Sequence, residues 1–95
     1  MITKVHKFLE TIGADTSIRS RLDKCIEEDF ELMDAFLAAD RADIISEVAD
    51  RIITGYALLI ALGGNEATVL DKMWEVMQRP EYQNLKPELE HLEPT

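Results

Sequence analysis

Residues 24–50, with the sequence KCIEEDFELMDAFLAADRADIISEVAD, hold the pattern that decides the fold. Two acidic motifs stand in this stretch: EExxE over Glu27–Glu31 and ExxD over Glu47–Asp50. Residues three positions apart on an α-helix lie on one face, separated by about 4.5 Å of rise. The stretch therefore predicts two helices, each carrying a pair of carboxylates one turn apart.

The two motifs are separated by a short connection, predicted over residues 38–42. A short connection makes consecutive helices antiparallel neighbours, so the pair Glu28/Glu31 can face the pair Glu47/Asp50. Converging carboxylates repel by about 4 kcal/mol per pair at about 4 Å and an effective dielectric near 20. Such a cluster needs protonation or cations, and hard oxygen ligands favour Mg²⁺, Mn²⁺ or Ca²⁺ over zinc. Acidic runs on helices are also commonly just solvated, and each motif alone is weak.

Apolar residues at helical spacing continue on both sides of this stretch. They predict helices over residues 2–12, 18–37, 43–62 and 66–79, ended by Gly13, Gly63-Gly64 and Pro80, with N-cap candidates at Asp15, Thr16, Ser17 and Asn65. No useful length alternates β-branched with polar residues as a strand would. We expect one helical domain over residues 1–80 and an acidic tail over 81–95, which forms a short helix near Glu88, drapes over a neighbour or is disordered.

The third predicted helix is apolar on nearly every side from Ile52 to Leu62. A helix that is apolar all round is buried all round, so it is expected to be central and to pack against a second subunit. Asp50 lies just before this apolar half. Because a buried unpaired carboxylate is costly, Asp50 is expected to have a partner.

Composition narrows the possible functions. The 95 residues allow one domain, and at 46% hydrophobic the chain is expected to be a homo-oligomer. Nineteen acidic against ten basic residues give a net charge of −9, which argues against nucleic acid and anionic membranes as partners. Neither a signal peptide nor a spanning segment is recognisable, so a cytoplasmic location is expected. The single cysteine, Cys25, is expected to be a small buried hydrophobe.

Further features extend the pattern: Lys24-Cys-Ile-Glu27-Glu28-Asp-Phe-Glu31, a short connection, Glu47-Val-Ala-Asp50, an apolar helix and Gly63-Gly64. In this order, over about residues 3–79, the sequence resembles the MazG family of all-α nucleoside triphosphate pyrophosphohydrolases. The opening Val5-His6-Lys7-Phe8-Leu9 is also similar to the start of family members. The resemblance implies a four- to five-helix bundle forming a tight dimer or a dimer of dimers.

The resemblance also implies Mg²⁺-dependent hydrolysis of a nucleoside triphosphate to the monophosphate and pyrophosphate, with Mn²⁺ as a possible substitute. It implies the metal ligands Glu28, Glu31, Glu47 and Asp50. Glu27 would be a further ligand or would orient the attacking water. Lys24 would offset phosphate charge, although an ordinary surface pair with Glu28 is an equal alternative.

One departure concerns the substrate contacts. Many family members carry an Asn and a Lys three apart after the fourth helix, whereas here Asn84 and Lys86 come later and are two apart. They are the candidate replacements. His6 and Trp74 are candidates to approach the base, with core packing or a surface role the better expectation for each.

The leading hypothesis is therefore a pyrophosphohydrolase that removes unwanted nucleotides from the pool. Phosphoribosyl-ATP pyrophosphohydrolase is a second enzymatic interpretation on the same acidic scaffold. A non-catalytic acidic helical protein that mediates protein contacts is the third, and loss of one acidic pair would favour it. Both pairs are intact.

Overall fold

The computed structural model describes residues 1–93, and all regular structure in that range is helical, as predicted. The chain divides into two compact units, Met1–Gly63 and Gly64–Thr95. The first unit contains three helices: α1 (Ile2–Thr11), α2 (Ile18–Ala38) and α3 (Arg41–Ala61). The second contains α4 (Glu66–Met77), η1 (Pro80–Leu85), α5 (Lys86–Leu89) and η2 (Glu90–Leu92).

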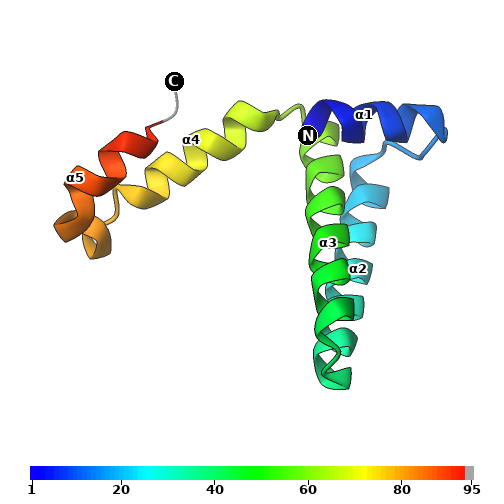
Figure 1. Ribbon diagram of the computed structural model, residues 1–95. Helices are drawn as coiled ribbons and strands as arrows, with labels where there is room; N and C mark the ends of the chain where they lie inside the picture. The colour runs from blue at the N-terminus through cyan, green and yellow to red at the C-terminus, as the bar shows by residue number, and fades with distance from the viewer. Residues whose placement is uncertain (94–95) are drawn as a thin grey trace. The chain divides into compact units, whose positions relative to one another are not determined.

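Helices α2 and α3 form an antiparallel hairpin that is the main body of the first unit (Figure 1). Only Ala39 and Asp40 connect them, and Ala39 adopts the left-handed conformation with φ 56°. Helix α3 begins at Arg41, two residues before the predicted start at Asp43, because the Asp40 carboxylate caps it by accepting from the Asp43 N–H at 3.2 Å.

Helix α1 lies across one end of this hairpin and packs against α3 (Figure 1). Its buried residue is Val5, 8% exposed. Gly13, with φ +65°, turns the chain after α1. Among the predicted cap candidates Ser17 caps α2, since its hydroxyl accepts from the Ser20 N–H at 3.2 Å. Asp15 stabilises the turn before it by accepting from the Ser17 N–H at 2.9 Å.

The core of the first unit is made of small side chains. Its buried apolar residues are Val5, Cys25, Ala35 and Ala57. The Cys25 thiol donates to the Thr54 carbonyl at 3.3 Å, and its burial confirms the prediction for this cysteine. Small residues let α2 and α3 approach closely, which matters for the acidic side chains described below.

Within the single chain α3 is covered on only part of its surface, so its predicted packing against a second subunit stays a prediction. Within Ile52–Leu62 the buried residue is Ala57, whereas Ile52, Ile53 and Leu62 are 49%, 42% and 60% exposed. The reason is geometric, because α2 and α1 cover only part of the circumference of α3.

The second unit begins with a well-formed cap. Asn65 and Thr68 bond reciprocally, each side chain accepting from the other residue's backbone N–H, as the predicted cap required. Residues 80–92 form short helical turns, including the short helix around Glu88. The predicted boundary after residue 80 lies inside this second unit, and residues 94–95 of the predicted tail lie outside the described residues. No helix within residues 1–93 is long and apolar enough to cross a membrane.

The α2–α3 connection generates a prediction about stability. At its positive φ the Cβ atom of Ala39 lies too close to the backbone, and glycine has no Cβ atom. Ala39→Gly should therefore stabilise the protein by about 0.5–1 kcal/mol. Ala38, the last residue of α2, is the matched control, and Ala38→Gly should destabilise by about 0.5–1 kcal/mol. Urea unfolding of the three proteins measures both changes in the free energy of unfolding. If both variants were stabilised or both destabilised, Ala39 would not be a strained position.

Candidate metal centre

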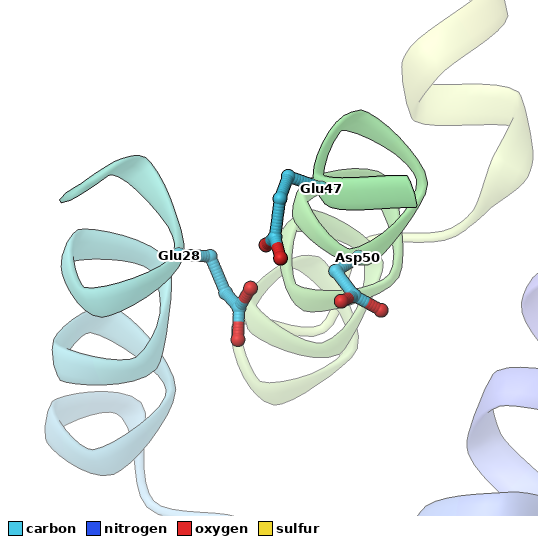
Figure 2. Close-up of side chains that lie close together, drawn as sticks. All are labelled: Glu28, Glu47 and Asp50. Atoms are coloured by element: carbon cyan, nitrogen blue, oxygen red, sulfur yellow. The ribbon is translucent and has the colours of Figure 1, made fainter. Parts of the chain in front are cut away.

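Three acidic side chains from the α2–α3 hairpin converge on one point. Glu28 projects from α2 and Glu47 from α3 into the space between the two helices, and Asp50 lies one turn further along α3, at the edge of this space (Figure 2). One carboxylate oxygen from each lies within 4.8 Å of the other two. The structure thus brings together three of the four predicted ligands from two elements that the short connection holds antiparallel.

Glu28 is the buried member of this cluster. It is 5% exposed, and its Oε2 atom is buried without a hydrogen-bond partner. Glu47 is half-buried, and its Oε2 atom is likewise buried and unpartnered. Asp50 is exposed, so the expectation that Asp50 carries the burial cost is wrong. The free energy of burying a carboxylate arises at Glu28, because that side chain points into the contact between the two helices and Asp50 lies at the edge of this contact.

The charges of the cluster disfavour ionisation. Burial raises the pKa of Glu47 above its ordinary value, and the neighbouring charges of Asp50 and Glu28 raise it further. Glu31, the fourth predicted ligand, is exposed and falls outside the close group. The charge of Glu28 is the main cause that raises the pKa of the Glu31 carboxyl, so Glu31 borders the cluster. A cation would relieve all of these interactions.

The donor set fits a hard divalent cation. Oxygens bound to one Mg²⁺ at about 2.1 Å are at most about 4.2 Å apart, so modest side-chain rotations would bring the three carboxylates around one ion. The two buried oxygens without partners, on Glu28 and Glu47, are the atoms that such an ion would satisfy. Cysteine and histidine ligands are absent from this group, which disfavours zinc.

Lys24 and Glu27 flank the cluster on α2. The Lys24 ammonium lies 3.2 Å from Glu27 Oε1 and 3.4 Å from Glu28 Oε1. Its pKa is raised, chiefly by the hydrogen bond to Glu27. Lys24 therefore forms the ordinary helix pair with Glu28 and also faces the cleft described next. Glu27 is exposed on the same rim, where it has access to solvent.

A cleft of about 790 Å³ opens beside the cluster, within the first unit. Glu28, Asp50, Glu27 and Lys24 line one part of it. The apolar part of the wall comes from α1, the turn after it and α3: Phe8, Leu9, Ile12, Ile53 and Ala57. The cleft thus joins a charged end to an apolar surface, an arrangement typical of small-molecule sites.

Arg21 also lines this cleft, and the sequence interpretation missed it. It is 8% exposed, and its Nη2 atom is buried without a hydrogen-bond partner. The available signal was its spacing, since Arg21 precedes Glu28 by seven residues, two helical turns, and so shares its face.

The remaining candidates lie elsewhere. The second unit contains three of the predicted residues, Trp74, Asn84 and Lys86. Trp74 is half-buried, and the other two are exposed. Their roles in substrate binding stay predictions. His6 is exposed on α1 and bonds to Glu10, in keeping with a surface role.

Comparison with known proteins adds no assignment. No family model matches the chain, and no curated protein or solved structure matches it either. The resemblance to the MazG family therefore depends on the motif residues of the sequence and stays a prediction.

The repulsion within the cluster predicts a pH dependence. Because the folded-state pKa of Glu47 is raised above its ordinary 4.5, the folded protein loses stability as pH rises through that raised value. In EDTA, Glu47→Gln should be close to wild type in stability near pH 4 and more stable than wild type at pH 7.5. Urea unfolding at both pH values measures the difference.

Asp34→Asn is the control for this prediction, because Asp34 is an exposed carboxylate of α2 outside the cluster. Its stability relative to wild type should change less between the two pH values. If the Glu47→Gln difference did not grow with pH, the three carboxylates would not be repelling one another.

Proposed function

We propose that the protein is a Mg²⁺-dependent nucleoside triphosphate pyrophosphohydrolase of the MazG type, with a role in clearing unwanted nucleotides. The observation that carries the proposal is the cluster of Glu28, Glu47 and Asp50, with two unpartnered buried oxygens, at the charged end of a cleft of about 790 Å³. A solvated acidic helix surface accounts poorly for Glu28, which is 5% exposed.

The net charge of −9 fits this function only with a metal ion between protein and substrate. Glu28, Glu47 and Asp50 would hold the ion, and Glu31 borders them as a further ligand. When bound, a divalent cation offsets phosphate charge and makes a water molecule more acidic. Mn²⁺ has the same preference for carboxylate oxygens and is the expected substitute.

The reaction consumes one water molecule. The water oxygen bonds to the α-phosphorus, the bond from that phosphorus to the bridging oxygen of the β-phosphate breaks, and pyrophosphate leaves with the electron pair. Glu27, which lines the cleft and is exposed to solvent, would orient the water and accept its proton. Lys24, which also lines the cleft, offsets charge on the phosphates.

The apolar wall of the cleft supplies a surface for the nucleoside. Phe8 and Ile12 at the α1 end and Ile53 on α3 line the cleft together with the charged group. A nucleobase has two apolar faces, so it gains from leaving water against such a wall.

We also propose that two copies of the chain associate through α2. An apolar stripe runs along this helix at helical spacing, and its members are 41–80% exposed: Leu22, Ile26, Phe30, Met33 and Leu37. An exposed apolar row of this length marks an interaction surface. The buried apolar residues of one chain are also few and small, so a single copy buries little apolar surface for a domain of this size.

Removing a metal ligand should abolish turnover without loss of metal-free stability. Asp50→Asn and Glu47→Ala are expected to lower kcat/KM by about a hundred-fold or more. Mutating residues that only hydrogen-bond to metal ligands already lowers metal affinity or activity by about 10–100-fold. Asp34→Asn is the matched carboxylate outside the cluster and should retain wild-type turnover. The readout is pyrophosphate release, with thermal melts in EDTA to verify folding. Ligand variants with normal turnover would rule out the assigned centre.

The assay that tests the function itself uses canonical and modified (d)NTPs together with phosphoribosyl-ATP, in Mg²⁺ and in EDTA. Mg²⁺-dependent formation of the monophosphate and pyrophosphate supports the proposal, and the preferred substrate decides between nucleotide clearance and histidine synthesis. A folded protein that binds no Mg²⁺ and releases no pyrophosphate would favour the non-catalytic interaction protein.

The subunit contact is tested separately. Phe30→Glu and Met33→Glu place a charge in the centre of the apolar stripe and should yield a single chain of 10.8 kDa, measured by size-exclusion chromatography with light scattering. Wild type should have at least twice that mass. Ala42→Glu adds the same charge in the exposed first turn of α3, where it suits the helix dipole, and should leave the mass unchanged. A wild-type protein that elutes as one chain would overturn this contact.

A further inference from the structure

Arg21 is a buried cation without an obvious partner. The residue is 8% exposed, and its Nη2 atom is buried and makes no hydrogen bond. It takes part in none of the ion pairs formed among residues 1–93. A buried guanidinium left unpaired is costly. The hydrogen bond from the Ser17 N–H and, to a smaller extent, the charge of Arg21 lower the pKa of the Asp15 carboxyl, but Asp15 is exposed and forms no ion pair with Arg21. The missing partner is therefore to be sought outside the protein.

The position of Arg21 indicates what that partner is. Arg21 lines the same cleft as Glu28 and Asp50. On α2 it precedes Lys24 by three residues and Glu28 by seven, so the three side chains follow one face of the helix. Arg21 and Glu28 are about 10.5 Å apart along the helix axis, and the Lys24 ammonium lies beside the Glu28 carboxylate, 3.4 Å from its Oε1 atom. The cleft thus offers a cation-binding end and, two turns away, an anion-binding end.

We propose that Arg21 binds the terminal phosphates of the substrate, the part that leaves as pyrophosphate. A guanidinium presents paired N–H donors that match two phosphate oxygens, which makes it the side chain best suited to this task. The inference rests on the proposed function, and it adds a phosphate-binding residue and the direction in which the triphosphate lies in the cleft. The α-phosphate lies nearest the carboxylates, and the β- and γ-phosphates extend toward the start of α2.

Arg19 provides a matched control on the same helix. It also lines the cleft, but its side chain is 83% exposed and its Nε atom pairs with Asp23 Oδ1 at 3.1 Å. An exposed arginine already paired with a carboxylate contributes little to binding. The two arginines therefore share charge, helix and cleft, and differ in burial and in pairing.

The test measures binding of pyrophosphate, inorganic phosphate and AMP to the full chain in Mg²⁺ by calorimetry. Arg21→Gln should weaken pyrophosphate binding by about ten- to a hundred-fold, the range for losing hydrogen bonds to a charged group. Mg²⁺ and AMP affinities should stay near wild type, and Arg21→Lys should be intermediate because it keeps the charge and loses the paired donors. Arg19→Gln should bind pyrophosphate within about a factor of two of wild type.

Folding is monitored by thermal melts. Arg21→Gln should melt no lower than wild type, because it removes a buried unpaired charge. If it fails to fold, Arg21→Met, which keeps the apolar stem, is judged by the same binding criteria. Unchanged pyrophosphate affinity in a folded variant would overturn the proposal, as would an equal loss of AMP and pyrophosphate binding or failure of all three variants to fold.

The result also separates this inference from the function on which it rests. Pyrophosphate binding that depends on Arg21, in a protein that hydrolyses no triphosphate, would reject the proposed function alone. Triphosphate hydrolysis with unchanged kcat and KM in Arg21→Gln would reject the role of Arg21 alone.

Discussion

The close contact between α2 and α3 forces like charges together, and the rest of the site depends on that contact. The residues buried along the two helices are small: Cys25, Ala35 and Ala57. An ion pair between Arg51 Nε and Asp29 Oδ1, 2.6 Å apart, joins the helices at the level of the acidic motifs. With little bulk between the helices, one carboxylate oxygen of Glu28 lies within 4.8 Å of one from Glu47 and one from Asp50. The hydrophobic contact thus supports an electrostatically unfavourable arrangement that a cation would stabilise.

Much of this architecture could be predicted from the sequence because local rules determine it. The helices, the caps at Ser17 and Asn65, the buried cysteine and the pairing of the two acidic motifs follow from spacing, capping chemistry and a short connection. The start of α3 was placed two residues late because the Asp40 cap went unrecognised. Such errors at helix ends leave the face of each helix unchanged, and the facing of the motifs depends on those faces and on the short connection.

The burial of individual groups could not be predicted in the same way. Which carboxylate is enclosed depends on the rotation of α2 about its axis relative to α3, and periodicity leaves this rotation undetermined within one face. The sequence therefore predicts Asp50 as the buried carboxylate, whereas in the structure Glu28 is buried and Asp50 is exposed. Arg21 was missed for a related reason, because a lone arginine on a helix is usually solvated and only the fold reveals that its guanidinium is enclosed. The contributions of Asn84 and Lys86 depend on the arrangement of the second unit, which local rules do not specify.

The two-residue connection at Ala39 and Asp40 has an evolutionary consequence. Because the connection has only two residues, we expect a residue gained or lost there to change how α3 is aligned with α2. Glu47 and Asp50 would then leave Glu28, even though every ligand remained in the sequence. We therefore expect the length of this connection to be constrained together with the acidic motifs, and the segment between α1 and α2, at residues 12–17, to be freer to vary in length. A search for proteins with the same site should hold the distance between the motifs nearly constant and leave the lengths outside them open.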